Sequence, residues 1–277
     1  MEKYVFCDLD DSLIVNGKLN EQIMYLYNNL QEATWVLNTG RSYSMACEIL
    51  SYLNFPNIDI IGLNGNQLVT KDGIQYLKVL EKKVITQLIN FYEGSQSIIN
   101  FYSSKNDYYL SFKDNIELCI HYARKANLKE NEILIKAIQY YMLYFEHFLK
   151  YTGKEDFDMF KITVTGNEQN LIRDFEELEL GNYCEATFLS NSIELSPIGI
   201  NKGTGIRKYF ELYNKKQEDY IIIAIGDAEN DISMFEQADI KIGSQKCTES
   251  IKKRSNFITD ESQMTDILRK IELYKKL

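Results

Sequence analysis

The chain is poor in histidine and proline and has few cysteines, and these shortages bear directly on its chemistry. Its two histidines, His121 and His147, lie in helix-like stretches rich in tyrosine, leucine and phenylalanine, where packing or surface roles are far more common than ligation. Its five cysteines are widely spaced and include no CxxC pair, so the sequence predicts neither a disulfide framework nor a thiolate zinc site. Any hydrolytic chemistry must therefore run on carboxylates and a hard metal ion.

The sequence also lacks a basic excess and any long apolar run. Lysine and arginine number 31 against 40 acidic residues, a net charge of −9, which is the wrong sign for a protein that neutralises nucleic-acid phosphates. No uninterrupted apolar run reaches the roughly 18 residues of a membrane span, and the opening MEKYVFCDLD has no secretory leader pattern. We expect a cytoplasmic protein that binds neither nucleic acid nor membranes, and no pattern in the sequence indicates an oligomeric state.

Hydrophobic patterns in the two outer parts of the chain predict one parallel sheet with helices on both faces. Short apolar runs alternate there with helical patterns, which is typical of strand–helix–strand units. The expected strands are 3–7, 34–38, 58–62, 192–196, 220–225 and 239–243, and the expected helices are 20–31, 42–53, 202–214 and 229–237.

The middle of the chain has a different pattern, which predicts a second domain inserted into the first. The expected elements are helices at 82–93 and 168–178, strands at 97–103, 107–112, 160–166 and 184–190, and a long tyrosine-rich helical region at 114–150. We interpret the many aromatic residues of this insert as its core. The sequence thus predicts an α/β protein with a Rossmann-like core at 1–81 and 191–277 and an inserted α+β cap at 82–190.

Four polar segments stand at or just beyond the carboxyl ends of expected core strands. In open parallel sheets this edge is where ligands bind, so we expect the four segments to form one site. They are DLDDSL (8–13), NTGRS (38–42), PIGINKG (197–203) and GDAENDISM (226–234).

Acidic residues in the first and last of these segments predict a metal site. Asp8 and Asp10 follow the first strand two residues apart, so both side chains are expected on the same side. Asp227 follows an apolar strand, and Asp231 stands one helical turn further on. Crowded carboxylates are costly without a divalent cation, and an all-oxygen set favours Mg²⁺.

Other residues of the segments are suited to binding phosphate. Ser12 and Thr39 offer hydroxyl donors, and Lys202 offers a compact cation at the start of an expected helix. Gly40 would let backbone amides approach a ligand closely. For Arg41 two interpretations stay open, contact with the ligand or pairing with a neighbouring acid.

The four segments resemble the four motifs of the haloacid dehalogenase superfamily, and within it those of the Cof-like sugar-phosphate phosphatases. The resemblance extends over the whole chain, and the insert is similar to the cap of this group in position and size. Two departures are visible. Asp11 and Ser12 stand where Gly-Thr is usual, and Ala228 stands where Gly is frequent, although both changes keep the chemical groups that the motifs require.

The resemblance implies a phosphatase that cleaves a small phosphorylated metabolite through a phosphoaspartate. By this resemblance Asp8 attacks phosphorus, while Asp10 protonates the leaving alcohol and then activates the water that hydrolyses the intermediate. The implied Mg²⁺ ligands are the carboxylates of Asp8 and Asp227 and the backbone carbonyl of Asp10, supported by Asp231.

The resemblance also implies a phosphate pocket and leaves the physiological reaction open. Thr39, Gly40, Lys202 and Asn230 would surround the phosphoryl group. A phosphomutase or phosphotransferase, in which a sugar hydroxyl replaces water as the acceptor, would carry the same motifs. A non-catalytic sensor of phosphorylated metabolites is a further alternative. Sugar phosphates, polyol phosphates, nucleotides and phosphorylated cofactors all remain possible ligands.

Overall fold

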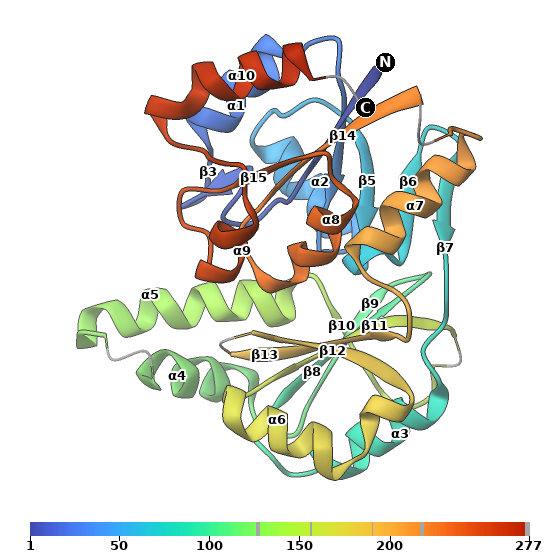
Figure 1. Cartoon of the computed structure of the whole chain (residues 1–277). Coiled ribbons are helices and arrows are strands. Elements are labelled where there is room, and N and C mark those ends of the chain that lie inside the picture. The colour runs from blue at the N-terminus through green and yellow to red at the C-terminus, as the bar shows by residue number, and fades with distance from the viewer. Residues whose placement is uncertain (126–127, 156, 190, 217–218, 275–277) are drawn as a thin grey trace. The chain divides into compact units, whose positions relative to one another are not determined.

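The computed structural model describes residues 1–125, 128–155, 157–189, 191–216 and 219–274. They form two compact units, a core unit (Met1–Leu77 with Gly199–Leu277) and an inserted unit (Lys78–Ile198). Both are drawn in Figure 1. Three parts of the expected elements lie outside the described residues, namely 126–127 of the helical region, Ser190 at the end of the strand 184–190, and 275–277 of the core.

The core unit is built on a sheet that is parallel over most of its width (Figure 1). Strands β1, β4, β5, β14, β15 and β16 run parallel, whereas β6 and β7 add an antiparallel edge that was not predicted. In order across the sheet the strands are β16 (Phe257–Ile258), β15 (Ile240–Gly243), β14 (Tyr220–Gly226), β1 (Glu2–Cys7), β4 (Thr34–Asn38), β5 (Asp59–Gly62), β6 (Gln67–Thr70) and β7 (Gly73–Tyr76). A separate short hairpin pairs β2 (Ile14–Val15) with β3 (Lys18–Leu19).

Strand β14 at the centre of this sheet has an almost continuous apolar run because both of its faces are buried. In β14, Ile221, Ile223 and Ile225 pack into one hydrophobic cluster, and the alternate residues pack into another on the opposite face. Side chains of a strand alternate between faces, so a strand covered on both sides reads as a continuous apolar run. The run YIIIAI of the sequence has this cause.

Helices cover both faces of the core sheet. Residues of α1 (Glu21–Asn29), α2 (Tyr43–Tyr52) and α10 (Met264–Leu273) join the cluster on one face. Residues of α7 (Lys202–Leu212), α8 (Ile232–Gln237) and α9 (Glu249–Arg254) join the cluster on the other. Burial of these apolar stripes is worth about 25 cal/mol for each Å² removed from water, and it fixes the loops that lie between strand ends and helix starts.

The inserted unit has its own mixed sheet, in which neighbouring strands are antiparallel except for the pair β9 and β10. In order its strands are β10 (Leu149–Lys150), β9 (Asp107–Ser111), β8 (Ile98–Ser103), β11 (Met159–Thr165), β13 (Ser192–Pro197) and β12 (Cys184–Leu189). The strand expected at 192–196 exists, but its assignment to the core sheet is wrong. It is β13, which pairs with β11 and β12 in the sheet of the inserted unit.

Two layers of helices cover the sheet of the inserted unit. Helices α3 (Lys82–Phe91) and α6 (Glu168–Glu177) contribute to one hydrophobic cluster, and α4 (Asn115–Lys125) and α5 (Glu130–Tyr141) contribute to another. The expected helical region 114–150 consists of α4, α5, a π-helical turn (Met142–Glu146) and strand β10. The prediction of an α/β fold with a mainly parallel core sheet and a separate inserted sheet is confirmed.

Candidate active site

Two aspartates meet at the carboxyl edge of the core sheet because their strands are adjacent and in register. Asp8 follows β1 and Asp227 follows β14, and these parallel strands pair with Cys7 opposite Ile225. The backbone N–H of Asp8 donates to the carbonyl of Ile225 at 2.9 Å and continues the ladder by one bond. Asp8 and Asp227 therefore lie at the same edge of the sheet, at the ends of two neighbouring strands.

Lys202 binds two carboxylates at this edge. Its Nζ donates to Oδ1 of Asp8 at 2.5 Å and to Oδ1 of Asp231 at 2.6 Å, and none of the three side chains is exposed by more than 9%. The lysine begins α7, whose first turn is capped by the side chain of Asn201. The Lys202 carbonyl also accepts a hydrogen bond from the buried amide of Asn38 at the end of β4, so the second segment helps to fix the third.

Asp231 binds backbone groups of its own segment. Its Oδ2 accepts the backbone N–H groups of Asp227 at 2.8 Å and Ala228 at 3.1 Å. Gly226 is required beside it, because a Cβ at that position would lie 2.6 Å from the carboxyl group of Asp231. The expected helix 229–237 starts as a 3₁₀ turn, Glu229–Asp231, which places this carboxylate under the loop. Asp231 therefore orders the backbone around Asp227 while its other oxygen binds Lys202.

Three carboxylates, those of the buried Asp8 and Asp231 and of the half-buried Asp227, carry more negative charge than the side chains around them neutralise. Suitable oxygen atoms of Asp8, Asp227 and Asp231 lie within 4.8 Å of one another. Lys202 supplies one positive charge against three negative ones, which leaves two negative charges at the site when all three are ionised. This imbalance and the all-oxygen donor set fit a divalent hard cation such as Mg²⁺.

The same imbalance appears in the acid–base properties of the site. Burial raises the pKa of Asp227 to about 7, and the neighbouring charge of Asp231 adds to the effect. Burial also raises the pKa of Asp8 well above its ordinary value, although Lys202 opposes the change. Burial works against the charge of Lys202, but the carboxylates of Asp231 and Asp8 outweigh it and hold its pKa above the usual range. Without a cation, the site thus resists full ionisation of its acids.

Ser12 and Asp10 lie in the first segment but have different surroundings. The buried hydroxyl of Ser12 donates to Oδ1 of Asp227 at 3.1 Å, so the structure places it beside a carboxylate. The carboxylate of Asp10 is half-exposed and is held by Arg41, whose Nε donates to Oδ2 at 2.7 Å and whose Nη2 donates to Oδ1 at 2.8 Å. Of the two interpretations of Arg41, the structure shows the pairing with an acid.

Thr39, which precedes Gly40 in the second segment, and Asn230 in the fourth are joined by a loop that sequence reasoning missed. The loop is Gly62–Asn66, which follows β5. The backbone N–H of Asn64 donates to the carbonyl of Thr39 at 3.1 Å, and its side-chain Oδ1 accepts from Asn230 Nδ2 at 3.3 Å. Leu63 and Asn64 both have positive φ values, a strained conformation that often occurs at functional sites. The signal available in the sequence was GLNGN directly after an expected core strand.

Gly65 lets this loop lie against the third segment. Its φ is +98°, and a Cβ there would lie 2.1 Å from the carbonyl oxygen of Asn201. Only glycine combines that backbone conformation with so close an approach. The four predicted segments are therefore brought together at one edge of the core sheet, with Gly62–Asn66 as a fifth. The third segment reaches this edge as the start of α7, since β13 before it belongs to the other sheet.

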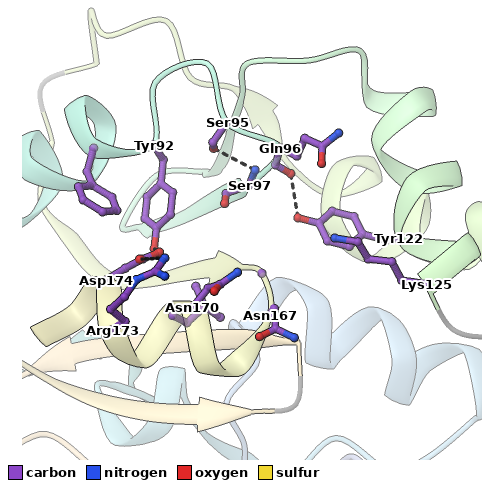
Figure 2. Close-up of a pocket in the computed structure, with 13 residues that line it drawn as sticks. Tyr92, Ser95, Gln96, Ser97, Tyr122, Lys125, Asn167, Asn170, Arg173 and Asp174 are labelled. Atoms are coloured by element: carbon purple, nitrogen blue, oxygen red, sulfur yellow. Dashed lines mark hydrogen bonds and ion pairs between the residues drawn. The ribbon is translucent and has the colours of Figure 1, made fainter. Parts of the chain in front are cut away.

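The inserted unit has a pocket of its own, shown in Figure 2. It has a volume of about 320 Å³ and lies among the end of α3, the end of α4 and the start of α6. Tyr92 and Asp174 point toward one another in it, joined by a hydrogen bond of 3.0 Å (Figure 2). The hydroxyl of Tyr122 donates to the carbonyl of Gln96 at 2.8 Å. None of the predicted site residues lines this pocket.

Comparison with known proteins gives a family model and several relatives named as phosphatases. A family model described as haloacid dehalogenase-like hydrolase matches residues 5–271. A phosphoglycolate phosphatase of Methanosarcina acetivorans is 38% identical over 81 residues, which span 29% of this chain and only 35% of that protein. In the part of the chain that the structure describes, no helix has the length and hydrophobicity needed to cross a membrane.

Solved structures share the fold over nearly the whole chain. A haloacid dehalogenase-like hydrolase from B. subtilis has a TM-score of 0.75 at 17% identity, covering 96% of this chain and 98% of the other. A subclass IIB sugar phosphatase of the same superfamily has a TM-score of 0.73 at 16% identity, covering 99% and 100%. The predicted resemblance is confirmed. With the family match spanning almost its full length, this chain belongs to the haloacid dehalogenase-like hydrolases.

Proposed function

We propose that the chain is a Mg²⁺-dependent phosphatase that hydrolyses a small phosphorylated metabolite through a phosphoaspartate on Asp8. The observation that carries this proposal is the contact of Lys202 with Asp8 and Asp231 at the edge where Asp227 also lies. A nucleophilic carboxylate next to a fixed ammonium group and further acids is suited to attack on a phosphate dianion. The relatives named as phosphatases support the same reaction class.

The proposed first step transfers the phosphoryl group to Asp8. An oxygen of the Asp8 carboxylate forms a bond to phosphorus, and the bond from phosphorus to the substrate oxygen breaks. That oxygen takes a proton from the carboxyl group of Asp10 and leaves as an alcohol. The Lys202 ammonium, 2.5 Å from Asp8 Oδ1, stabilises the charge that is shared between nucleophile and phosphate.

The proposed second step returns Asp8 to its starting state. Water attacks phosphorus and gives one proton to the Asp10 carboxylate, while the bond between phosphorus and Asp8 breaks. Inorganic phosphate leaves, and Asp10 is again able to donate a proton. Thr39, Gly40 and Asn230 would surround the phosphoryl group, because the loop Gly62–Asn66 ties their segments together.

The cation would be held by the carboxylates of Asp8 and Asp227 and the backbone carbonyl of Asp10, with Asp231 ordering the loop. When bound, it supplies the positive charge that keeps these acids ionised and offsets their repulsion of the substrate. We also propose that the inserted unit sets substrate selectivity, as lids of enzymes commonly do. Phosphoglycolate and sugar phosphates are the first substrates to try, because relatives are named for them.

The test is phosphate release from a panel of phosphorylated metabolites, measured with Mg²⁺ and with excess chelator. The proposal expects release of inorganic phosphate from at least one sugar or carboxylic-acid phosphate, and no release with chelator. Formation of an isomeric phosphosugar without free phosphate would indicate a phosphomutase instead. Binding of a metabolite without any turnover would indicate a sensor.

A further inference from the structure

Arg41 and Asp10 form a two-point ion pair at the candidate site, and Arg41 has no role in the proposed reaction steps. Nε and Nη2 of the arginine bind one carboxylate oxygen each, at 2.7 and 2.8 Å. This two-point geometry fixes both the position and the plane of a carboxylate, which a single ammonium group cannot do. The half-exposed Asp10 side chain lies in the loop between β1 and the β2–β3 hairpin.

The backbone of Arg41 is itself anchored on both sides. Its N–H donates to Oγ1 of Thr39 at 3.2 Å, and its carbonyl accepts the N–H of Leu63 at 2.9 Å. Gly62 permits the close approach, since a Cβ there would lie 2.9 Å from the Arg41 carbonyl oxygen.

A buried glutamine at the start of β6, Gln67, holds the backbone two residues after Arg41. Gln67 accepts the backbone N–H of Tyr43 with Oε1 at 2.7 Å and donates to the hydroxyl of Tyr76 at 2.9 Å. The backbone at the base of the Arg41 side chain is therefore fixed between β4 and α2 by contacts from the loop Gly62–Asn66 and from β6. Because the Arg41 backbone is fixed, its guanidinium group can hold the Asp10 side chain in one rotamer.

Each of the two carboxylates with a chemical role in the proposed reaction thus has its own cation. Lys202 holds the nucleophile Asp8, and Arg41 holds the proton-transfer residue Asp10. We infer that Arg41 is a positioning residue, which fixes the Asp10 carboxylate for proton transfer and does not itself bind the phosphoryl group. This inference rests on the proposed function, because Asp10 needs a fixed position only if it transfers protons in the reaction.

Pre-steady-state kinetics with p-nitrophenyl phosphate test this inference. p-Nitrophenolate is a good leaving group and needs no proton from Asp10, whereas hydrolysis of the phosphoaspartate needs Asp10 as a base. In Arg41→Gln we expect a burst of p-nitrophenol close to one equivalent of enzyme, followed by a steady rate that is lower by about 10- to 100-fold. The ratio kcat/KM, which reports the first step, should stay within about twofold of the wild-type value because no substrate contact is lost, and KM should fall together with the steady rate.

Substrates with poor leaving groups should respond differently. For an alkyl phosphate both steps need Asp10, so Arg41→Gln should slow turnover without giving a burst of the alcohol. Arg41→Lys keeps the charge but offers only a single-point contact, and it should behave like Arg41→Gln. Added guanidinium ion should restore part of the activity of Arg41→Gln, and added ammonium ion should not.

Lys215→Gln is the matched control. Lys215 forms a surface ion pair with Glu2 at 2.5 and 2.7 Å in the same unit, and its loss should leave all the kinetic constants unchanged. An equal rise of KM for every substrate with kcat intact would overturn the inference and make Arg41 a substrate ligand. Wild-type activity in Arg41→Lys would also overturn it, because charge alone would then suffice.

A readout without substrate separates this inference from the proposed function. In a crystal structure of Arg41→Gln we expect the Asp10 side chain in more than one rotamer, with the Asp8–Lys202 contact unchanged. A single unchanged Asp10 rotamer would contradict the positioning role. Absence of phosphate release by the wild-type protein would instead contradict the proposed function, whatever Asp10 does in that crystal.

Discussion

The ammonium nitrogen of Lys202 lies 2.5 Å from Oδ1 of Asp8, although the two residues are 194 positions apart in the sequence. The contact is buried, and Lys202 also holds Asp231. A lysine buried in this way is stable only because carboxylates surround it, and the carboxylates depend on it in return. Removal of any one of these three side chains therefore leaves the charges of the others without compensation.

Replacement of Lys202 by methionine should damage both stability and catalysis. Breaking a buried ion pair on one side leaves uncompensated charge and costs about 3–5 kcal/mol, and loss of a fixed cation at a reacting centre lowers kcat by about 10²- to 10³-fold. Urea unfolding and kcat measurements on the same preparation check both effects. Lys215→Met breaks a surface ion pair whose side chains are 28% and 54% exposed, and it should cost much less stability than Lys202→Met. A Lys202→Met protein as stable and active as Lys215→Met would contradict this account.

The stability of the metal-free protein should fall as the pH rises through the weakly acidic range. The pKa of Asp227 is raised to about 7 in the folded chain, above the value of about 3.9 in an unfolded one. Below the lower value the Asp227 carboxyl group is neutral in both states, so no charge is buried and folding has no electrostatic cost from it. Above about pH 7 it is charged in both states, so the cost is fully present. Urea titrations in chelator across this range measure the slope, and Asp227→Asn should flatten it.

The affinity for Mg²⁺ should change with pH in the opposite sense. A proton on Asp227 competes with the cation, so binding should tighten as the pH rises toward and past about 7 and should release protons. Calorimetric titration with MgCl₂ in buffers of different ionisation enthalpy measures both the affinity and the protons released. A binding constant that does not vary with pH over this range would show that Asp227 is not a ligand.

Gly65→Ala should destabilise the core unit and also reduce activity. The new Cβ would meet the Asn201 carbonyl at 2.1 Å, at a backbone φ of +98°, so the strain of about 1–3 kcal/mol adds to a steric clash. Gly73→Ala is the matched control, since its φ is +122° but no atom lies within 4 Å of the added Cβ. Thermal unfolding of both variants separates backbone strain from the clash, and equal losses would contradict the close packing of the loop against Asn201.

Tyr92→Phe should destabilise the inserted unit without removing any group of the candidate active site. The tyrosine hydroxyl donates to Asp174 at 3.0 Å, and the carboxylate is buried (Figure 2). A hydrogen bond to a charged group is worth about 1.5–3 kcal/mol. Chemical unfolding should show a loss in this range. Arg173→Gln removes the other, largely exposed partner of Asp174 and should cost less. A Tyr92→Phe protein as stable as the wild type would mean that Asp174 is satisfied without the tyrosine.

Local patterns in the sequence were sufficient for most elements of the core unit. The run TWVLN is a strand with the bounds that its apolar pattern predicts, and Lys202 begins a helix as expected. The strand 192–196 was also real, but its sheet was wrong. Alternation of side chains identifies a strand and says nothing about its partners, and β13 finds them in β11 and β12.

The candidate site was predictable where strand order decides it and unpredictable where loops fold onto each other. Asp8 and Asp227 meet because β1 and β14 are neighbours, whereas the predicted parallel sheet placed them only at the same edge. The contacts of Asn64 with the second and fourth segments depend on a loop with two non-glycine residues in the left-handed region. No periodicity encodes such a loop, and the choice of Asp10 as the partner of Arg41 depends on the same loop.

The central claim is that Asp8 becomes phosphorylated during turnover, and acid quenching followed by intact-protein mass spectrometry tests it most directly. Wild-type protein mixed with Mg²⁺ and substrate should gain the mass of one phosphoryl group, which peptide mapping places on Asp8, and Asp8→Asn should gain none. Asp11→Asn is the matched control, because Asp11 is exposed at a positive φ that asparagine tolerates, and it should be phosphorylated like the wild type. Phosphate release by a folded Asp8→Asn protein at the wild-type rate would contradict the account.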